Sequence, residues 1–162
     1  MENKNINCDI KVFVMDVDGT MTDGKIYMGK HGEEFKAFNI KDGYGIHEIL
    51  PGFSIKTAIL TGRKSDIVDN RAKELEIDYV LQNVKDKKAA ILDLAVELGC
   101  ELSQVAYIGD DIIDIGAMQL CGLKGCPADA TFEVKSICDF ISEKNGGDGA
   151  VRDFIEWLVN NR

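Results

Sequence analysis

The sequence has few residues that could cross-link it or hold a soft metal. Its 162 residues include two histidines and five cysteines, and the cysteines are irregularly spaced without any CxxC pair. This scarcity argues against a zinc site or a disulfide framework. We expect free, mostly buried thiols at Cys8, Cys100, Cys121, Cys126 and Cys138.

Positive charge and long apolar runs are also in short supply. Lysine and arginine total 19 against 28 acidic residues, for a formal net charge of −9. This balance argues against nucleic acid as a partner, and an anionic substrate would need local cations or a metal. No run approaches the roughly 18 apolar residues of a membrane span, and Met1 to Lys11 is polar. We therefore expect no membrane partner and a cytoplasmic location.

What is present is a regular alternation of short apolar runs and amphipathic segments. The runs at 11–15, 55–60 and 104–108 predict buried parallel strands, with shorter ones near Tyr79, Leu123 and Phe140. The segments at 65–75 and 86–98 predict helices, the second ending at Gly99. This order predicts an α/β fold with a doubly wound, Rossmann-like parallel sheet, in which ligands bind beyond the carboxyl ends of the strands.

Two segments interrupt this alternation. Residues 24–39 place a glycine-rich centre between runs with aromatic residues, which predicts a projecting β-hairpin. Residues 145–149 (NGGDG) form a loop before a final helix, so that the tail and helix span about 145–160. No insertion is long enough for a cap domain, and we expect residues 1–162 to form a single domain.

An acidic pair follows the first predicted strand, in the sequence Asp16-Val17-Asp18-Gly19-Thr20. Alternation along an extended chain sends Asp16 and Asp18 to one side and Val17 to the other. Two carboxylates about 4 Å apart repel by roughly 4 kcal/mol at an effective dielectric constant near 20. A divalent cation or a shared proton would relieve this repulsion. The alternative is an ordinary Asp-Gly turn that closes a strand.

Polar groups after other strands strengthen the case for a site. The second strand is followed by Thr61, Arg63 and Lys64, and Lys87 begins a predicted helix. The third strand is followed by three more carboxylates, Asp110, Asp111 and Asp114. Five carboxylates at one edge of the sheet would require compensation. Oxygen ligands, without suitable Cys or His, indicate Mg²⁺. The alternative to a role in the site for Asp111 is to cap the N-terminus of the helix that follows it.

With these motifs in order, the sequence resembles the haloacid dehalogenase superfamily of aspartate-nucleophile phosphatases. The resemblance implies that Asp16 attacks phosphorus and becomes an aspartyl phosphate, while Asp18 acts as general acid and then as general base. It implies that Mg²⁺ is bound by Asp16, the backbone carbonyl of Asp18, and Asp110. Thr61 and Lys87 would hold the transferring oxygens, and Asp111 and Asp114 would support the metal's water shell or orient Lys87.

Nearly end to end, the chain further resembles the 3-deoxy-D-manno-octulosonate 8-phosphate phosphatases, in DVDGTMTDG (16–24), FNIKDGYGI (38–46), LTGRK (60–64), YIGDD (107–111) and GGDGAVR (146–152). That resemblance implies hydrolysis of this sugar acid phosphate in lipopolysaccharide precursor synthesis. It also implies a capless homotetramer, in which the hairpin helps to form the oligomer and the glycine-rich C-terminal segment reaches a neighbour's active site. Arg63 and Lys64 would contact the sugar acid, with a solvated surface charge as the alternative for Lys64. The family often has a basic residue in place of Asp148.

Three other readings are open. A phosphatase for nine-carbon sialic-type sugar acid 9-phosphates is the nearest. A receiver-type phosphoacceptor switch also uses an acidic Mg²⁺ site, a Thr and a Lys, but its acidic pair does not contain the nucleophile. A pseudoenzyme scaffold is disfavoured by the intact motif set. His31 and His47 are expected to be solvated surface residues.

Overall fold

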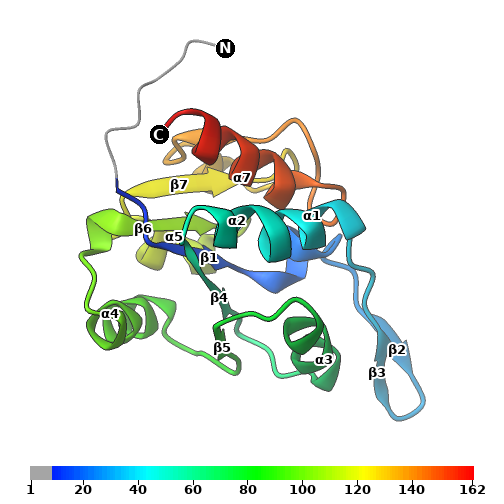
Figure 1. The fold of residues 1–162 in the computed structure, drawn as a ribbon. Helices are drawn as coiled ribbons and strands as arrows, with labels where there is room; N and C mark the ends of the chain where they lie inside the picture. Colours follow the sequence, from blue (N-terminus) through cyan, green and yellow to red (C-terminus); the bar gives the residue numbers. More distant parts are fainter. Residues whose placement is uncertain (1–8) are drawn as a thin grey trace.

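A six-stranded, fully parallel sheet forms the centre of the computed structural model, which describes residues 9–162 (Figure 1). The strand order is β5-β4-β1-β6-β7-β8. The strands are β1 (Val12–Met15), β4 (Lys56–Leu60), β5 (Tyr79–Leu81), β6 (Val105–Ile108), β7 (Leu123–Cys126) and β8 (Phe140–Ile141). The predicted fold class is confirmed, and each predicted strand is present. Residues 1–8, which include Cys8 and most of the polar opening segment, lie outside the described residues.

β1 lies in the middle of the sheet because all of its side chains can be buried. Its four residues, VFVM, are buried on both faces, as a continuous apolar run predicts. Phe13 and Met15 join one core cluster, whereas Val12 and Val14 join the other. β1 pairs with β4 on one side and with β6 on the other, so that Met15 is level with Ile59 and Ile108. The carboxyl ends of these three strands therefore meet.

Helices cover both faces of the sheet, giving three layers (Figure 1). One face is covered by α3 (Asp66–Glu74), α7 (Ala150–Asn160) and a continuous helical segment made of α1 (Ile40–Tyr44), η2 (Gly45–Ile49) and α2 (Leu50–Gly52). The other is covered by α4 (Lys87–Leu98), α5 (Ile112–Met118) and α6 (Phe132–Lys135). A short turn, η3 (Leu102–Gln104), precedes β6.

The predicted helices at 65–75 and 86–98 are present as α3 and α4, and the predicted end of the second helix at Gly99 is confirmed. Val68, Ala72 and Leu75 are buried on one stripe of α3. The Asp86 side chain accepts a hydrogen bond of 3.0 Å from the Ala89 backbone N–H at the start of α4. Gly99 ends α4 in the left-handed conformation with φ of +61°, which glycine adopts without strain.

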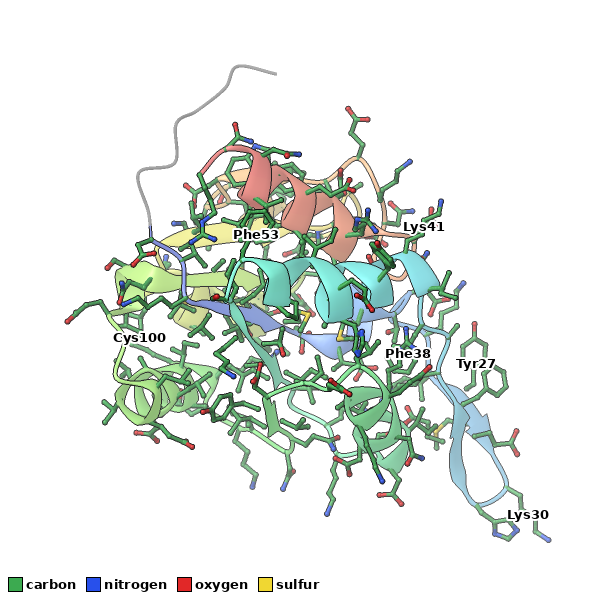
Figure 2. All side chains as sticks on the ribbon, viewed as in Figure 1. Tyr27, Lys30, Phe38, Lys41, Phe53 and Cys100 are labelled. Carbon is green, nitrogen blue, oxygen red and sulfur yellow. The ribbon has the colours of Figure 1, made fainter. Side chains whose placement is uncertain are left out.

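The predicted hairpin is formed by β2 (Tyr27–Gly29) and β3 (Gly32–Phe35), and it projects from the body of the molecule (Figure 1). Tyr27 and Phe35 stack with ring centroids 4.3 Å apart. Met28 is 66% exposed and Phe35 52% exposed. Figure 2 shows Lys30 at the tip of the hairpin, pointing away from the sheet. Such a two-stranded ribbon has little apolar surface to bury within its own chain.

The cysteines and the apolar segments follow the sequence analysis as far as the structure describes them. Cys100, Cys121, Cys126 and Cys138 are free thiols. Among residues 9–162, none of the helices combines the length and the apolar character needed to span a bilayer.

α7 begins without a cap of its own, and a residue distant in sequence supplies one. Gly149, at the N-cap position, has no side chain to accept a hydrogen bond. Asp42, buried at the start of the helical segment 40–52, accepts the Arg152 backbone N–H at 2.8 Å. Burial raises the pKa of Asp42 to about 6, although backbone hydrogen bonds at the start of α7 oppose the shift. Asp42 thereby joins two helices and fixes the entry to α7.

We predict that Asp42→Ala lowers the free energy of unfolding by about 1–3 kcal/mol, since the Arg152 N–H then loses its partner. Urea titration at neutral pH measures the change. The matched control is Asp93→Ala, on the exposed side of α4, which should stay within about 0.5 kcal/mol of the wild type. Equal effects of the two substitutions would contradict the capping role.

Candidate active site

Polar residues from three neighbouring strands meet at the carboxyl edge of the sheet. Asp16 follows β1, Thr61 follows β4 and Asp110 lies two residues beyond β6. Val17 is buried in the core cluster opposite to the one that contains Val12 and Val14, as the predicted alternation requires. These residues lie beyond the ends of parallel strands, which is where the sequence analysis expected the site.

A buried ion cluster occupies the centre of this edge. Lys87, at the start of α4, places its Nζ 2.7 Å from Asp16 Oδ1 and 2.7 Å from Asp114 Oδ1. The three side chains are at most 5% exposed. Burial opposes a raised pKa for Lys87, but the charges of Asp16 and Asp114 outweigh it and raise the pKa. Lys87 is therefore a charged ammonium that links the ends of β1 and α5.

Asp114 uses its carboxylate to organise the residues around it. Oδ1 accepts hydrogen bonds from Lys87 Nζ and, at 2.8 Å, from the buried Tyr107 hydroxyl. Oδ2 accepts the backbone N–H groups of Asp110 and Asp111 at 3.2 and 3.3 Å. With both oxygens engaged, Asp114 orients Lys87 and the loop that carries Asp110.

The predicted convergence of five carboxylates is wrong for two of them. Carboxylate oxygens of Asp16, Asp110 and Asp114 lie within 4.8 Å of one another. Asp111 is instead exposed and caps α5, accepting the Ile112 N–H at 2.7 Å. The side chain of Asp18 faces other cations, described below. The chain turns sharply after Asp16, so strand geometry does not carry Asp18 into the acidic group.

The acidic group fits a divalent cation. Three carboxylates (Asp16, Asp110, Asp114) against one ammonium (Lys87) leave a formal charge of −2. Burial and the charge of Asp114 raise the pKa of Asp16 to about 7, although Lys87 lowers it. Burial and the charge of Asp16 likewise raise the pKa of Asp110 to about 7. Oxygen-only groups that repel one another in this way are what Mg²⁺ requires.

The Gly19-Thr20 pair explains why the first motif needs these two residues. Gly19 has φ of +94°, and a Cβ there would lie 2.1 Å from Asp110 Oδ2. Only glycine therefore lets Asp110 approach the first loop. Thr20 then donates a hydrogen bond of 3.0 Å from its hydroxyl to Asp110 Oδ1. The two residues position Asp110 next to Asp16.

The glycine-rich segment 145–149 packs on the same loop of its own chain. A Cβ at Gly146 would lie 1.9 Å from the Gly19 carbonyl oxygen, and the Gly147 N–H donates to the Thr20 carbonyl at 3.1 Å. Asn39 Nδ2 donates to the Gly147 carbonyl at 3.3 Å. Its glycines therefore support the loop that carries Asp18 and Gly19 in the same chain. The predicted reach of this segment to a neighbouring copy stays a prediction.

Asp18 is held by two cations, of which Lys36 lies outside the predicted set and Arg63 within it. Its carboxylate accepts a short hydrogen bond from Lys36 Nζ, and Arg63 Nε lies 3.9 Å from Asp18 Oδ2. Glu33 Oε1 contacts both cations, at 2.9 Å from Lys36 Nζ and 3.3 Å from Arg63. The predicted Arg63 therefore lies beside Asp18. Lys64 is exposed and forms no ion pair within residues 9–162, in line with its alternative as a solvated charge.

Four residues at this edge were missed by the sequence analysis: Thr20, Glu33, Lys36 and Tyr107. Thr20 and Tyr107 lie inside motifs that were noted, but a hydroxyl in a motif does not reveal its partner. Lys36 follows β3 directly and is buried, and the sequence analysis made no prediction about it. Its only sequence signal is the Glu33–Lys36 charge pair three residues apart.

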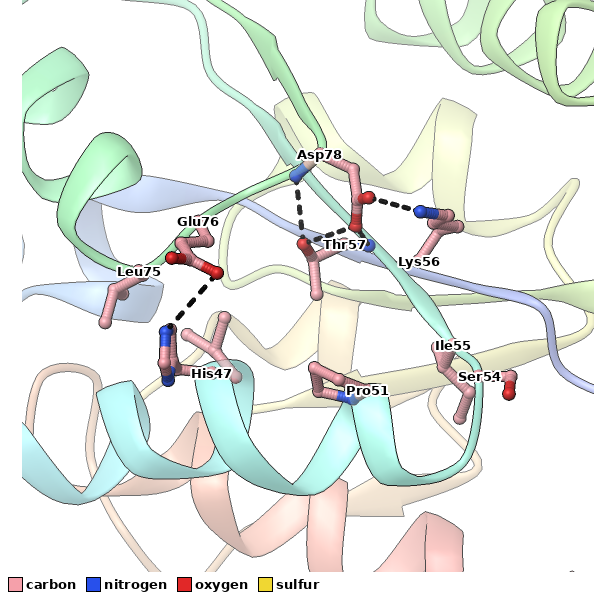
Figure 3. A pocket seen from close by; sticks show the side chains of 10 residues that line it. His47, Pro51, Ser54, Ile55, Lys56, Thr57, Leu75, Glu76 and Asp78 are labelled. Atoms are coloured by element: carbon pink, nitrogen blue, oxygen red, sulfur yellow. Dashed lines mark hydrogen bonds and ion pairs between the residues drawn. The ribbon is translucent and has the colours of Figure 1, made fainter.

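A large hollow lies away from this site. It has a volume of about 410 Å³ and is found where β4 and β5 begin, at the opposite edge of the sheet (Figure 3). Its polar groups contact one another: Lys56 Nζ is 2.6 Å from Asp78 Oδ1, and His47 Nε2 is 3.7 Å from Glu76 Oε2. His47 thus lies far along the strands from Asp16, consistent with the absence of a catalytic role in the sequence analysis.

Comparisons with known proteins agree with this geometry. A family model for haloacid dehalogenase-like hydrolases matches residues 71–155. The chain is 42% identical to the 3-deoxy-D-manno-octulosonate 8-phosphate phosphatase of Yersinia pestis over 93% of this chain and 80% of the relative. It is also 42% identical to the enzyme of the same name from Escherichia coli K12, with the same coverage.

Solved structures show the same fold. One is the 3-deoxy-D-manno-octulosonate 8-phosphate phosphatase of Moraxella catarrhalis in complex with magnesium ion, phosphate ion and KDO. It has a TM-score of 0.94 and 40% identity, covering 100% of this chain and 94% of that one. Another is the cobalt-bound deoxy-D-mannose-octulosonate 8-phosphate phosphatase of Haemophilus influenzae, with a TM-score of 0.91 and 36% identity, covering 94% and 89%.

The crowded carboxylates predict a specific pH dependence in the presence of a chelator. Since the pKa values of Asp16 and Asp110 are both raised to about 7, the folded protein binds more protons than the unfolded chain between about pH 4 and 7. Their contribution to stability is therefore greatest at low pH and is lost as the pH rises through this window.

Asp110→Asn removes one of these charges, so we expect the metal-free variant to be more stable than the wild type at pH 8, by at least about 1 kcal/mol. The difference should shrink toward pH 4. Urea unfolding at both pH values in EDTA measures it, with Asp93→Asn as a surface control. A difference that does not change with pH would contradict the repulsion between Asp16 and Asp110.

Proposed function

We propose that this chain, which belongs to the haloacid dehalogenase-like hydrolases and within them to the 3-deoxy-D-manno-octulosonate 8-phosphate phosphatases, hydrolyses 3-deoxy-D-manno-octulosonate 8-phosphate to the free sugar acid and phosphate. The observation that carries the proposal is the buried cluster of Asp16, Lys87 and Asp114 at the carboxyl edge of the sheet, with the half-buried Asp110 beside it. The reaction would serve lipopolysaccharide precursor synthesis in the cytoplasm.

Asp16 is the proposed nucleophile. Its Oδ1 is engaged by Lys87, and the other carboxylate oxygen is left to attack phosphorus. Attack forms a bond from Asp16 to phosphorus and breaks the bond from phosphorus to the sugar oxygen, giving an aspartyl phosphate. Water then hydrolyses this intermediate and releases phosphate. Lys87 and Thr61 are the proposed contacts for the oxygens of the transferred phosphoryl group, and Lys87 compensates part of their charge.

Asp18 is the proposed proton carrier. It would donate a proton to the departing sugar oxygen and later accept one from the attacking water. Its carboxylate is 21% exposed, whereas that of Asp16 is 5% exposed, so Asp18 lies closer to the solvent side of the site. This difference in exposure suits a nucleophile within the site and an acid at its entrance.

Magnesium is the proposed metal, with Asp16, Asp110 and the Asp18 backbone carbonyl as its ligands. The formal charge of −2 in the acidic cluster and its oxygen-only groups support this choice. When bound, the ion would offset the negative charge that Asp16 and the phosphate bring together. Asp114 supports the site indirectly through Lys87 and the loop of residues 109–111, and Asp111 through its cap on α5.

Arg63 is the proposed contact for the carboxylate of the sugar acid. Arg63 is partly exposed while it contacts Asp18 and Glu33, so its guanidinium is accessible to a substrate in its present position. Lys64 is a second candidate from the adjacent exposed position. A nine-carbon sialic-type sugar acid 9-phosphate is the alternative substrate, because a few loop contacts worth about 1–3 kcal/mol each decide sugar length.

A homotetramer is the proposed assembly, with the site covered by a neighbouring copy. Residues 1–162 would act as one catalytic domain without a cap. The exposed Ile26, Met28 and Phe35 on the hairpin support an interface there. The glycine-rich segment packs on its own chain at residues 146–147, and the contact of the C-terminal segment with a neighbouring copy's site is a second part of this proposal.

A phosphate-release assay with Mg²⁺ tests the proposed reaction. We expect the eight-carbon sugar acid phosphate to be hydrolysed with a higher kcat/KM than the nine-carbon one. Asp16→Asn should lower turnover by roughly 10³-fold or more while the fold is retained, because it removes the nucleophile. Asp93→Asn is the surface control. Retained turnover in Asp16→Asn would refute the assignment of Asp16 as the nucleophile. A higher kcat/KM for the nine-carbon sugar acid phosphate would refute only the proposed substrate.

Sedimentation tests the assembly. We expect the wild type to sediment as a tetramer, and Met28→Asp to give smaller species with lower activity, since a charge on the hairpin opposes burial there. Val96→Asp is the matched control, because Val96 is 82% exposed on α4, away from the hairpin. A monomeric wild type with full activity would contradict the shared site.

A further inference from the structure

The base of the hairpin carries a buried cation that neither the motifs nor the proposed chemistry uses. Lys36 follows β3 directly, and its side chain is 1% exposed. Its Nζ contacts Asp18 Oδ1 and lies 2.9 Å from Glu33 Oε1. A lysine is rarely buried unless it is paired. The burial of Lys36 is therefore tied to the two carboxylates that it contacts.

Glu33 connects this lysine to the loop after β4. Its Oε1 contacts Lys36 and Arg63, and its Oε2 accepts a hydrogen bond of 2.7 Å from the Ser65 hydroxyl. Two carboxylates, Asp18 and Glu33, face two cations, Lys36 and Arg63, so that the set is neutral. The hairpin thereby joins the loop after β1 to the loop after β4 within one chain.

We infer that Lys36 is a positioning residue that fixes the carboxylate of Asp18 for proton transfer, with Glu33 holding Lys36 in place. The inference rests on the proposed role of Asp18 as general acid. The contacts of the Asp18 carboxylate within residues 9–162 are Lys36 and, more distantly, Arg63. Of these two, Lys36 is buried and the guanidinium of Arg63 is partly exposed, so Lys36 is the better-ordered support.

The consequence is that the hairpin has a catalytic task in its own chain, in addition to any contact between copies. A carboxylate that must give its proton to a departing oxygen has to lie within hydrogen-bond reach of it. A displacement of about 1 Å can cost about 10²-fold in rate. Within residues 9–162 no backbone N–H donates to the Asp18 carboxylate, so loss of the Lys36 contact leaves it only the more distant Arg63.

Two aryl phosphates with different leaving groups distinguish a misplaced general acid from a general loss of structure, because only one of the leaving groups needs a proton. Phenyl phosphate needs a proton on its departing oxygen, whereas 2,4-dinitrophenyl phosphate releases a stable anion. We expect Lys36→Met to lower kcat/KM for phenyl phosphate by about 10²-fold and for 2,4-dinitrophenyl phosphate by less than about threefold. Neither compound carries a sugar, so lost sugar binding cannot produce this contrast.

Three further variants complete the experiment. Lys36→Arg keeps the positive charge and should restore most of the activity on phenyl phosphate. Glu33→Gln should show the same selective loss of activity on phenyl phosphate, but a smaller one. If Lys36→Met does not fold, Glu33→Gln tests the inference in its place. Lys73→Met, at an exposed position on α3, is the matched control and should leave the hydrolysis of both compounds unaffected.

Asp18→Asn separates the failure of this inference from the failure of the proposed function. Selective loss on phenyl phosphate in both Asp18→Asn and Lys36→Met supports the inference. If Asp18→Asn is selective but Lys36→Met lowers both substrates equally, or neither, Lys36 does not position the acid. If Asp18→Asn itself shows no selectivity, the proposed role of Asp18 is refuted and the role of Lys36 falls with it.

Discussion

The ion cluster of Lys87 with Asp16 and Asp114 is the constraint on which the rest of the site depends. Its three charges are removed from water where β1, α4 and α5 meet, and the loss of one partner from such a group typically costs 3–5 kcal/mol. The cluster therefore fixes how two helices on one face of the sheet approach the first strand. It also leaves the Asp16 carboxylate oriented, with one oxygen engaged and its charge only partly compensated.

Glycines around the loop after β1 complete that arrangement. The absence of a side chain at Gly19 lets Asp110 approach, and its absence at Gly146 lets the C-terminal turn pack on the same loop. Asp42 adds a distant support, because it caps the helix that follows the turn. The loop after β1 and the turn that packs on it are thus supported by residues outside the proposed chemistry.

Much of this could be predicted because it depends on local patterns. The apolar run at 11–15 and the polar residues that follow predicted a central strand with the site at its end, and Lys87 was placed by the helix that it begins. What could not be predicted depends on tertiary contacts. The turn after Asp16 sends Asp18 toward Lys36 rather than into the acidic group, and no periodicity shows that Lys36 is buried.

The central proposal is that Asp16 becomes covalently phosphorylated during turnover. The most direct measurement is to quench the Mg²⁺-loaded enzyme in acid during turnover of the eight-carbon substrate and to map the phosphorylated peptide by mass spectrometry. The account predicts phosphate on Asp16, in an amount that falls as substrate is exhausted. Phosphate on another residue, or turnover without any phosphorylated enzyme when the quench is faster than one catalytic cycle, would contradict it.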